Sequence, residues 1–164
     1  MALNGYTVTK HPMNVSINIL QAGAADIEDL AELFDAYRVF YGQTPNLQLA
    51  RSFLRERLMQ SESTIFLARD SQGRPVGFTQ LYPTFSSIAC MRAFILNDLY
   101  TVEAARGKGV GRALLTAARD HAAAAGAAYL TLETALDNSK AQSLYRSFGF
   151  VRDTQFCTYS MSLI

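Results

Sequence analysis

The stretch from Asn97 to Leu115 restricts the fold of this chain more than any other part of the sequence. It begins as an apolar strand, continues through the glycine-rich turn Arg106-Gly107-Lys108-Gly109-Val110-Gly111, and ends in an amphipathic helix. A strand that enters a helix through such a turn points backbone N–H groups outward, where the helix dipole favours an anion. Arg106, Lys108 and Arg112 add positive charge, so the sequence predicts a site for a phosphate or pyrophosphate.

Two common phosphate-binding motifs do not fit this turn. A P-loop requires G-x-x-x-x-G-K-S/T, but Lys108 stands between two glycines and is followed by Gly109. The dinucleotide fingerprint G-x-G-x-x-G also fails, because the frame from Gly107 ends on Arg112 and the frame from Gly109 ends on Leu114. The run does fit the pattern Q/R-x-x-G-x-G/A in full.

The length and charge of the chain exclude several classes of protein. Its 164 residues, 49% hydrophobic and 18% charged, indicate one globular domain rather than a disordered chain. A net charge of +1 gives no support for nucleic-acid binding. No apolar stretch reaches the roughly 18 residues of a membrane span, and residues 1–14 lack the apolar core of a signal peptide. We therefore expect a cytoplasmic protein without nucleic-acid or membrane partners.

The cysteines predict no metal or redox site. Cys90 and Cys157 are far apart and form no C-x-x-C motif. We expect both to be buried or half-buried thiols, and we expect no bound metal.

Apolar periodicity predicts alternating strands and helices over most of the chain. The expected strands are 15–19, 64–69, 76–82, 89–101, 129–134 and 155–163, and the expected helices are 26–41, 46–60, 109–125 and 138–148. This order, β-α-α-β-β-β-α-β-α-β, predicts an α/β fold with a mixed sheet and helices on both faces. Residues 1–14 have no clear period and are expected to form an extension of a single domain at 15–164.

Three stretches, in this order, resemble the GCN5-related N-acetyltransferase (GNAT) superfamily, and the small bacterial-type members in particular. The first is the strand and loop at 97–115. The second, Leu130-Thr131-Leu132-Glu133-Thr134, is similar to the strand that splays from its neighbour to admit the cofactor. The third, residues 138–150, is similar to the family stretch N-x-x-A-x-x-L/F-Y-x-x-x-G-F. The resemblance covers 15–164 and implies the acyl-CoA N-acyltransferase fold, with a mostly antiparallel central sheet.

The resemblance also implies acetyl-CoA as the cosubstrate, with its pyrophosphate on the glycine-rich loop. Main-chain groups at the preceding strand end would contact the pantetheine arm, and one N–H there would face the developing oxyanion. Asn138 is predicted to cap a helix as well, and Lys140 fits either the nucleotide end or a solvated position. The expected cofactor-binding residues are Leu99, Tyr100, Thr101, Arg106, Gly107, Lys108, Gly109, Val110, Gly111, Arg112, Asn138 and Lys140.

Proton transfer defines the candidate catalytic residues. When an amine attacks a thioester, the leaving thiolate needs a proton, and Tyr145 is the candidate general acid; the alternative is a core aromatic. An amine with a pKa of about 10.4 is almost fully protonated at neutral pH, so a general base is needed as well. Asp98 and Glu133 lie on the two strands expected to flank the site and are the candidates, although either also fits a structural salt bridge.

The acceptor is expected on the wall formed by residues 26–60. Tyr37, Tyr41 and Gln43 lie near the break between its two helices and suggest an aromatic pocket edge for an amine, with ordinary core aromatics as the alternative. We predict transfer of an acetyl group to a primary amine, in a small amine, polyamine, amino acid or lysine side chain, by direct attack in a ternary complex. A non-catalytic acyl-CoA-binding sensor or interaction module, and an acyltransferase for longer acyl groups, remain as alternatives. The apolar tail at 156–164 is compatible with a homodimer.

Overall fold

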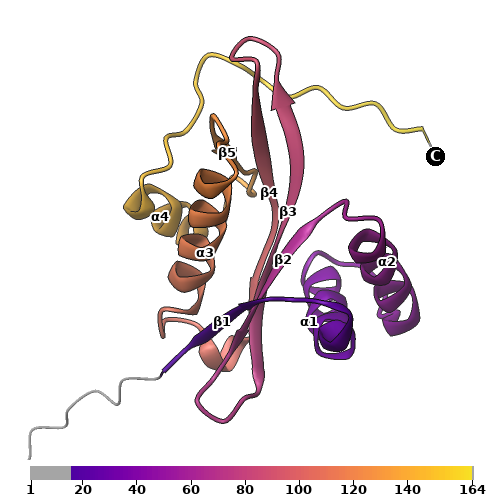
Figure 1. Cartoon of the computed structure of the whole chain (residues 1–164). Helices are drawn as coiled ribbons and strands as arrows, with labels where there is room; N and C mark the ends of the chain where they lie inside the picture. Colours follow the sequence, from indigo (N-terminus) through magenta and orange to yellow (C-terminus); the bar gives the residue numbers. More distant parts are fainter. Residues whose placement is uncertain (1–15, 164) are drawn as a thin grey trace, which may run out of the picture.

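One five-stranded sheet organises residues 16–163, which are the residues that the computed structural model describes; the extension predicted at 1–14 lies outside them. The strands lie in the order β1 (Asn18–Gln21), β2 (Thr64–Arg69), β3 (Pro75–Ser86), β4 (Met91–Thr101) and β5 (Leu130–Thr131) (Figure 1). Neighbouring strands are antiparallel, except that β4 and β5 are parallel. The predicted mixed and mostly antiparallel sheet is therefore confirmed.

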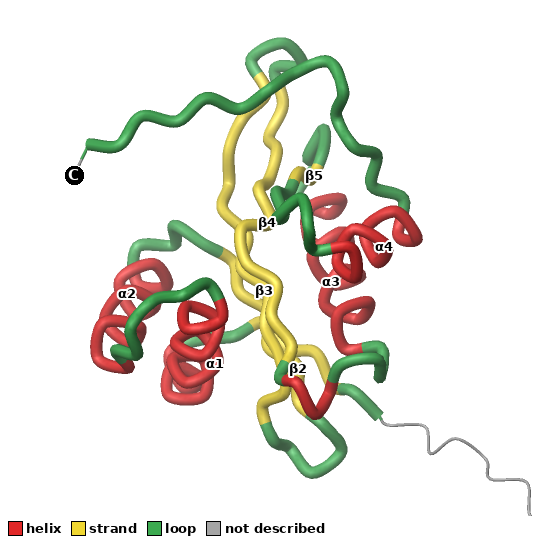
Figure 2. The backbone as a smooth tube through the Cα atoms, turned by 180° about the vertical axis from the view of Figure 1, so that it is seen from behind, coloured by secondary structure: helices red, strands yellow, loops and turns green. Residues whose placement is uncertain are grey.

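Helices cover both faces of this sheet. One face carries α1 (Ile27–Phe40) and α2 (Leu47–Met59), and the other carries α3 (Val110–Ala124) and α4 (Ser139–Phe148), as both views show (Figures 1 and 2). Two short 3-10 helices, η1 (Ala24–Asp26) and η2 (Glu103–Ala105), precede α1 and follow β4. Among the described residues, no helix is long and apolar enough to cross a membrane.

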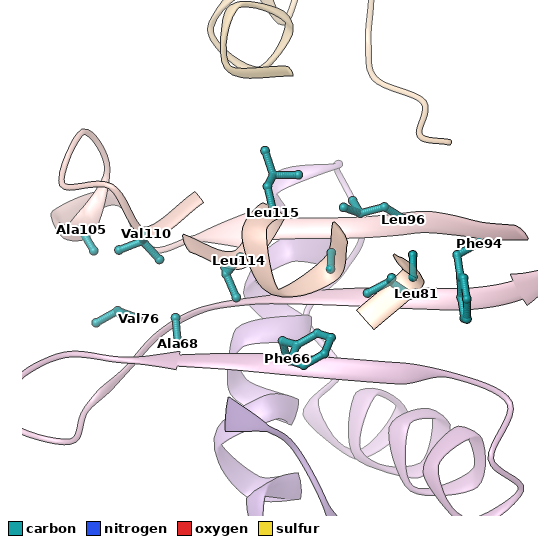
Figure 3. Packing of buried hydrophobic residues seen from close by; sticks show 12 residues of the cluster. Phe66, Ala68, Val76, Leu81, Phe94, Leu96, Ala105, Val110, Leu114 and Leu115 are labelled. Carbon is teal, nitrogen blue, oxygen red and sulfur yellow. The ribbon is translucent and has the colours of Figure 1, made fainter. Parts of the chain in front are cut away.

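Each face of the sheet has its own apolar core. On the α3 face, Phe66, Leu81 and Leu114 belong to a cluster that joins β2, β3, β4 and α3 (Figure 3). On the α1 face, Phe78 lies at the centre of a second cluster with side chains from α1 and α2. A strand residue therefore contributes to one core or the other according to the direction of its side chain.

A β-bulge in β4 decides which of its side chains face which core. Gln80 of β3 pairs with Asp98, whereas the next residue of β3 pairs with Leu96, so Asn97 is the extra residue on β4. Leu96 and Leu99 both pack on the α3 side, although three positions separate them. Asp98 and Tyr100 consequently face α1.

Gly77 lies where β3, β4 and α3 approach one another most closely. A Cβ built on it would lie 2.6 Å from the carbonyl oxygen of Tyr100 and 3.2 Å from Val110 Cγ1. Because the first atom belongs to the backbone, we expect Gly77→Ala to lower the free energy of unfolding by about 1–3 kcal/mol, measured by urea denaturation. Gly23→Ala is the control, since no atom lies within 4 Å of its Cβ position. Equal losses in the two variants would contradict this account.

The prediction of a last strand at 155–163 is wrong. Residues 151–163 are exposed and belong to neither a strand nor a helix, so the element order ends with α4. The strand predicted at 129–134 is also shorter, because β5 contains only Leu130–Thr131. Both segments have strand-like sequences, but a strand also needs a hydrogen-bonding partner, and the outer edge of β5 has no neighbouring strand within the described part of the chain.

Two smaller expectations were also wrong. Residues 83–86, which follow the strand predicted at 76–82, are also strand, because β3 continues to Ser86 and forms a long hairpin with β4. Cys90 and Cys157 are both exposed rather than buried, since one lies in the turn of this hairpin and the other in the C-terminal tail.

Candidate active site

The glycine-rich turn forms the N-terminus of α3. Gly107 and Gly109 have φ angles of 74° and 87°, in the region that residues with a side chain rarely adopt. Gly109 is the N-cap of α3, and no side chain caps the helix there. The backbone N–H groups of a 15-residue helix are therefore available to a ligand, and this geometry fits the predicted pyrophosphate.

The cationic residues around this turn are held in different ways. The Arg106 Nε donates to the carbonyl oxygen of Thr101 at 3.2 Å, and its guanidinium lies 5.7 Å from the ring centroid of Phe40. Arg112 donates to Ser147 Oγ at 2.6 Å and so ties α3 to α4. Lys108, in contrast, is exposed on the turn, as is Lys140 on α4. Lys108 is thus an exposed cation beside the helix N-terminus, whereas the two arginines are oriented by their neighbours.

An opening separates β4 from the chain that follows β5. The two strands pair only at Phe94 with Leu130 and at Ile95 with Thr131. Beyond this point β4 continues to Thr101, while the other segment leaves the sheet and leads to α4. Within residues 16–163, the strand end Leu99–Thr101 therefore has no strand partner on that side, and it leads directly into η2 and the glycine-rich turn.

Asp98 is a buried carboxylate on the side of β4 that faces α1. Only 4% of the surface of Asp98 is exposed to solvent. Oδ1 accepts a hydrogen bond from Asn97 Nδ2 at 3.2 Å, and the hydroxyl of Tyr37 on α1 also donates to the carboxylate. Oδ2 is buried without a hydrogen-bond partner among the described residues. Burial raises the pKa of Asp98 above its usual value, and the two hydrogen bonds oppose this shift only in part.

Gln80 is a second buried polar residue that sequence analysis missed. It is the cross-strand neighbour of Asp98 and is fully buried. Its Nε2 donates to the hydroxyl of Tyr82 at 2.7 Å, while Oε1 has no described partner. The sequence feature that could have identified Gln80 is its position as the polar residue between Phe78 and Tyr82, on the same face of the predicted strand.

Tyr145 of α4 packs against the α3-side core and lines a cavity with the segment that follows β5. The residue is half-buried, and its ring packs against Phe150 with the centroids 5.9 Å apart. Burial, and next the proximity of Tyr41, raises the pKa of Tyr145 to about 12. The hydroxyl is therefore protonated at every ordinary assay pH, as a general acid requires.

The structure brings most of the predicted catalytic and acceptor residues together. Tyr37 and Tyr41 pack edge to face with ring centroids 5.0 Å apart. The pKa of Tyr37 is raised first by burial, then by the charge of Asp98, and also by Tyr41 and Tyr145. Side chains from α1, β4 and α4 thus influence one another in one place.

Three predicted residues lie at the margin of this group or have another contact. Glu133 is exposed beyond β5 and accepts a hydrogen bond from Thr158 Oγ1 at 3.3 Å. Gln43 is exposed in the turn after α1. The predicted helix cap at Asn138 is confirmed, because its Oδ1 accepts from the backbone N–H of Ala141 at 3.2 Å.

Two parallel strands that separate beside a glycine-rich helix N-terminus point to a protein that transfers acyl groups. The chain belongs to the Acetyltransferase (GNAT) family, whose profile matches residues 27–150. The predicted superfamily is thereby confirmed, and the protein is an acetyltransferase enzyme.

Particular relatives agree with this membership. The chain is 48% identical over 147 residues to YhfO of Bacillus subtilis (strain 168), described as an uncharacterized N-acetyltransferase, covering 90% of this chain and 98% of YhfO. A crystal structure of a probable acetyltransferase is 40% identical with a TM-score of 0.85, covering 90% and 98% of the two chains. The aminoglycoside N-acetyltransferase AAC(6')-Iy, solved in complex with CoA, shares the fold with a TM-score of 0.75 at 17% identity, covering 92% and 98%.

Proposed function

We propose that this enzyme transfers an acetyl group from acetyl-CoA to a primary amine, by direct attack in a ternary complex. The observation that carries the proposal is the free, buried Oδ2 of Asp98, which lies on the face of β4 opposite the α3 core and beside the hydroxyl of Tyr37. A buried carboxylate oxygen without a donor is costly, and an ammonium group or a water molecule would satisfy it.

The donor half of the site is built from backbone. The loop Gly107–Gly111 would hold the pyrophosphate with N–H groups at the N-terminus of α3, and Leu99–Thr101 would contact the pantetheine arm. When bound, acetyl-CoA supplies the activated acetyl thioester. An N–H of the same strand end would stabilise the negative charge that develops on the carbonyl oxygen.

Two side chains of this chain handle the protons. Asp98 would accept a proton from the ammonium form of the acceptor, directly or through water, because only the neutral amine is a nucleophile. Tyr145 would donate a proton to the departing thiolate. Their environments support these roles. Burial raises the pKa of the Asp98 carboxyl, which makes it a stronger base, and burial also keeps the Tyr145 phenol protonated.

The acceptor wall favours a cation. A groove of about 600 Å³ lies between α1 and the end of β4, and its charged lining consists of Glu32, Asp35 and Glu103 together with Arg106, whose guanidinium lies over the Phe40 ring. The carboxylates outnumber this one cation of the lining, and carboxylates attract an ammonium group. We infer that the acceptor carries positive charge in addition to the reacting amine, as a polyamine or a lysine-containing peptide does.

Thiol release from acetyl-CoA tests the proposal. A panel of polyamines, amino acids, lysine peptides and neutral small amines would be assayed, and calorimetry would measure acetyl-CoA binding separately. We expect binding, together with amine-dependent release for at least one cationic acceptor. Binding without release on every amine would favour the sensor alternative, and no binding would reject the donor assignment. Release with a longer acyl-CoA in preference to acetyl-CoA would favour the broader acyltransferase.

A matched pair of glycine substitutions tests the loop. Gly107→Ala and Gly126→Ala both place a side chain at a positive φ angle with no atom within 4 Å of its Cβ. We expect both to lose about 0.5–2 kcal/mol of stability, because the backbone strain is similar. Only Gly107→Ala should weaken acetyl-CoA binding, by about tenfold, which is about 1.4 kcal/mol, in calorimetry. Equal affinities in the two variants would remove this loop from the donor site.

A cytoplasmic location and a homodimer complete the proposal. The enzyme would find both acetyl-CoA and its amine acceptor in the cytoplasm. The exposed apolar side chains of residues 156–163 support self-association.

A further inference from the structure

Two buried polar side chains on neighbouring strands each have one oxygen atom without a hydrogen-bond donor. Gln80 of β3 is the direct cross-strand neighbour of Asp98 on β4, and both residues are buried. Within residues 16–163, Oε1 of Gln80 and Oδ2 of Asp98 both lack a partner. A buried acceptor without a donor is costly, so two of them on one pair of residues need an explanation.

Both side chains lie on the side of the sheet that faces α1. Gln80 stands two residues after Phe78, which packs in the α1-side core. Asp98 stands two residues before Tyr100, which packs against the same core. Because side chains alternate along a strand, the amide and the carboxylate share this face. Cross-strand neighbours on one face have Cβ atoms about 4.5–5.5 Å apart, so the two side chains adjoin.

The hydroxyl of Tyr82 holds one end of the Gln80 amide. Nε2 of Gln80 donates to this hydroxyl at 2.7 Å. Tyr82 also lies within the electrostatic influence of the carboxylate, since burial and then the charge of Asp98 raise the pKa of Tyr82 to about 12. With Nε2 engaged by the tyrosine, the carbonyl end of the amide is the end that is left for Asp98.

We propose that Gln80 is a positioning residue for Asp98, and that its Oε1 accepts a hydrogen bond from Oδ2 once the carboxylate has taken up a proton. The proposal rests on the role of Asp98 as the general base in the proposed function. In the ionised state both oxygens are acceptors and repel each other, whereas one proton on Oδ2 gives each of them a hydrogen bond. Gln80 thus increases the proton affinity of Asp98 by stabilising the neutral carboxyl.

The proton transfer itself is balanced within the site. An N–H bond of the acceptor ammonium breaks, its electron pair remains on nitrogen as the nucleophilic lone pair, and an O–H bond forms at Oδ2 of Asp98. This O–H group then donates to Oε1 of Gln80, which holds the proton while the amine attacks. The proton returns to solvent after the acetylated product has left.

The neighbours of Asp98 leave its titration distinct. The charged and titratable groups around it are Tyr37 and Tyr41 of α1, Tyr82 of β3, Tyr145 of α4, and Arg57 and Glu62 beyond Tyr82. Burial, followed by the charge of Asp98, raises the pKa of both Tyr37 and Tyr82, so these phenols stay neutral at acidic and neutral pH. Arg57 and Glu62 form an ion pair with each other. A proton uptake at acidic pH on this face of β4 therefore belongs to Asp98.

Carbon-13 NMR of the aspartate carboxyl groups measures the pKa of Asp98 without any substrate, and the signal that is lost in Asp98→Asn assigns it. Gln80→Met keeps the length of the side chain and removes the acceptor. We expect the acid dissociation constant of Asp98 to rise about tenfold in this variant, which is a lower pKa. Tyr82→Phe frees Nε2 to turn toward the carboxylate, so it should lower the pKa of Asp98 as well.

The direction of the change decides the outcome. A higher pKa of Asp98 in Gln80→Met would mean that a donor, Nε2 or a water molecule, already lies between the two oxygens, and this would overturn the proposal. An unchanged pKa would overturn it too. Should Gln80→Met fail to fold, Tyr82→Phe decides alone, because it keeps both the ring and the amide.

Thr79→Val is the matched control. Thr79 is fully buried on the same strand, and its Oγ1 donates to the backbone carbonyl oxygen of Asp98 at 2.8 Å. Losing this bond should lower the free energy of unfolding and leave the pKa of Asp98 unchanged. An equal change of the pKa in Thr79→Val would reduce the effect of Gln80→Met to damage of the fold and reject the positioning role.

Amine-dependent thiol release provides the second readout. In Gln80→Met, the acidic limb of kcat/KM should move down with the pKa measured by NMR, and kcat/KM at neutral pH should fall by about threefold to tenfold, because Asp98 is a weaker base. Acetyl-CoA affinity should not change. If the NMR titration moves as expected while the wild type releases no thiol with any amine, the pairing of Gln80 with Asp98 stands and the proposed function fails.

Discussion

Replacing Tyr145 with phenylalanine is expected to lower kcat by about 10²–10³-fold and to leave acetyl-CoA affinity nearly unchanged. The substitution removes only the hydroxyl, so the ring still packs against Phe150. Without the hydroxyl, the thiolate must leave unprotonated or take its proton from water. The measurement is steady-state thiol release at saturating amine, with calorimetry for the cofactor.

Tyr129→Phe is the control for this variant, because Tyr129 is an exposed tyrosine that directly precedes β5. It should keep the wild-type kcat. Since the pKa of Tyr145 is about 12, the wild-type enzyme should show no loss of activity from ionisation of this phenol between pH 7 and pH 10. An unchanged kcat in Tyr145→Phe would remove the residue from the mechanism and leave it a core aromatic.

Asp98→Asn is expected to lower kcat/KM at neutral pH by about 10²–10⁴-fold. The amide has nearly the same shape but cannot accept the proton of the acceptor ammonium. The deficit should shrink as the pH approaches the pKa of the amine, because the neutral amine then forms in solution without a base. In the wild type, activity should fall at low pH around a pKa above the usual aspartate value, and this acidic limb should be absent from the variant.

Stability separates this effect from damage to the fold. Burial raises the pKa of Asp98, so the folded state binds the proton more tightly than the unfolded state does. Above that pKa, the buried charge therefore lowers the free energy of unfolding. Asp98→Asn should be at least as stable as the wild type at pH 7 while being far less active. Glu133→Gln, which changes an exposed carboxylate, should stay near wild-type activity; the reverse ranking would identify Glu133 as the base.

The glycine-rich turn and the helix start that follows it could be predicted from sequence because they are local. Glycines at positive φ, a helix start and a cap at Asn138 all depend on a few consecutive residues. The orientation of Asp98 toward α1 could not be derived in this way, since it depends on the bulge at Asn97 and on the pairing with β3. Gln80 was missed for the same reason, because only the pairing of β3 with β4 shows that this buried amide lies opposite Asp98.

The segment at 155–163 shows the limit of reading periodicity alone. Alternation at 157–163 is typical of a strand, but the segment forms no strand in the structure. The alternation does not say which backbone edge the segment could pair with. The physical reason is that strand hydrogen bonds join residues distant in sequence, whereas helical hydrogen bonds join residues four apart.

The single extra residue at Asn97 also allows the two faces of the sheet to change independently of each other. It sets the phase of β4 so that Leu99 packs on the α3 side while Asp98 and Tyr100 face α1, which with α2 is the proposed acceptor wall. Substitutions in α1 and α2 can alter the acceptor without passing through the glycine-rich turn. A library confined to those two helices would therefore be a route to new amine specificities that keeps the donor unchanged.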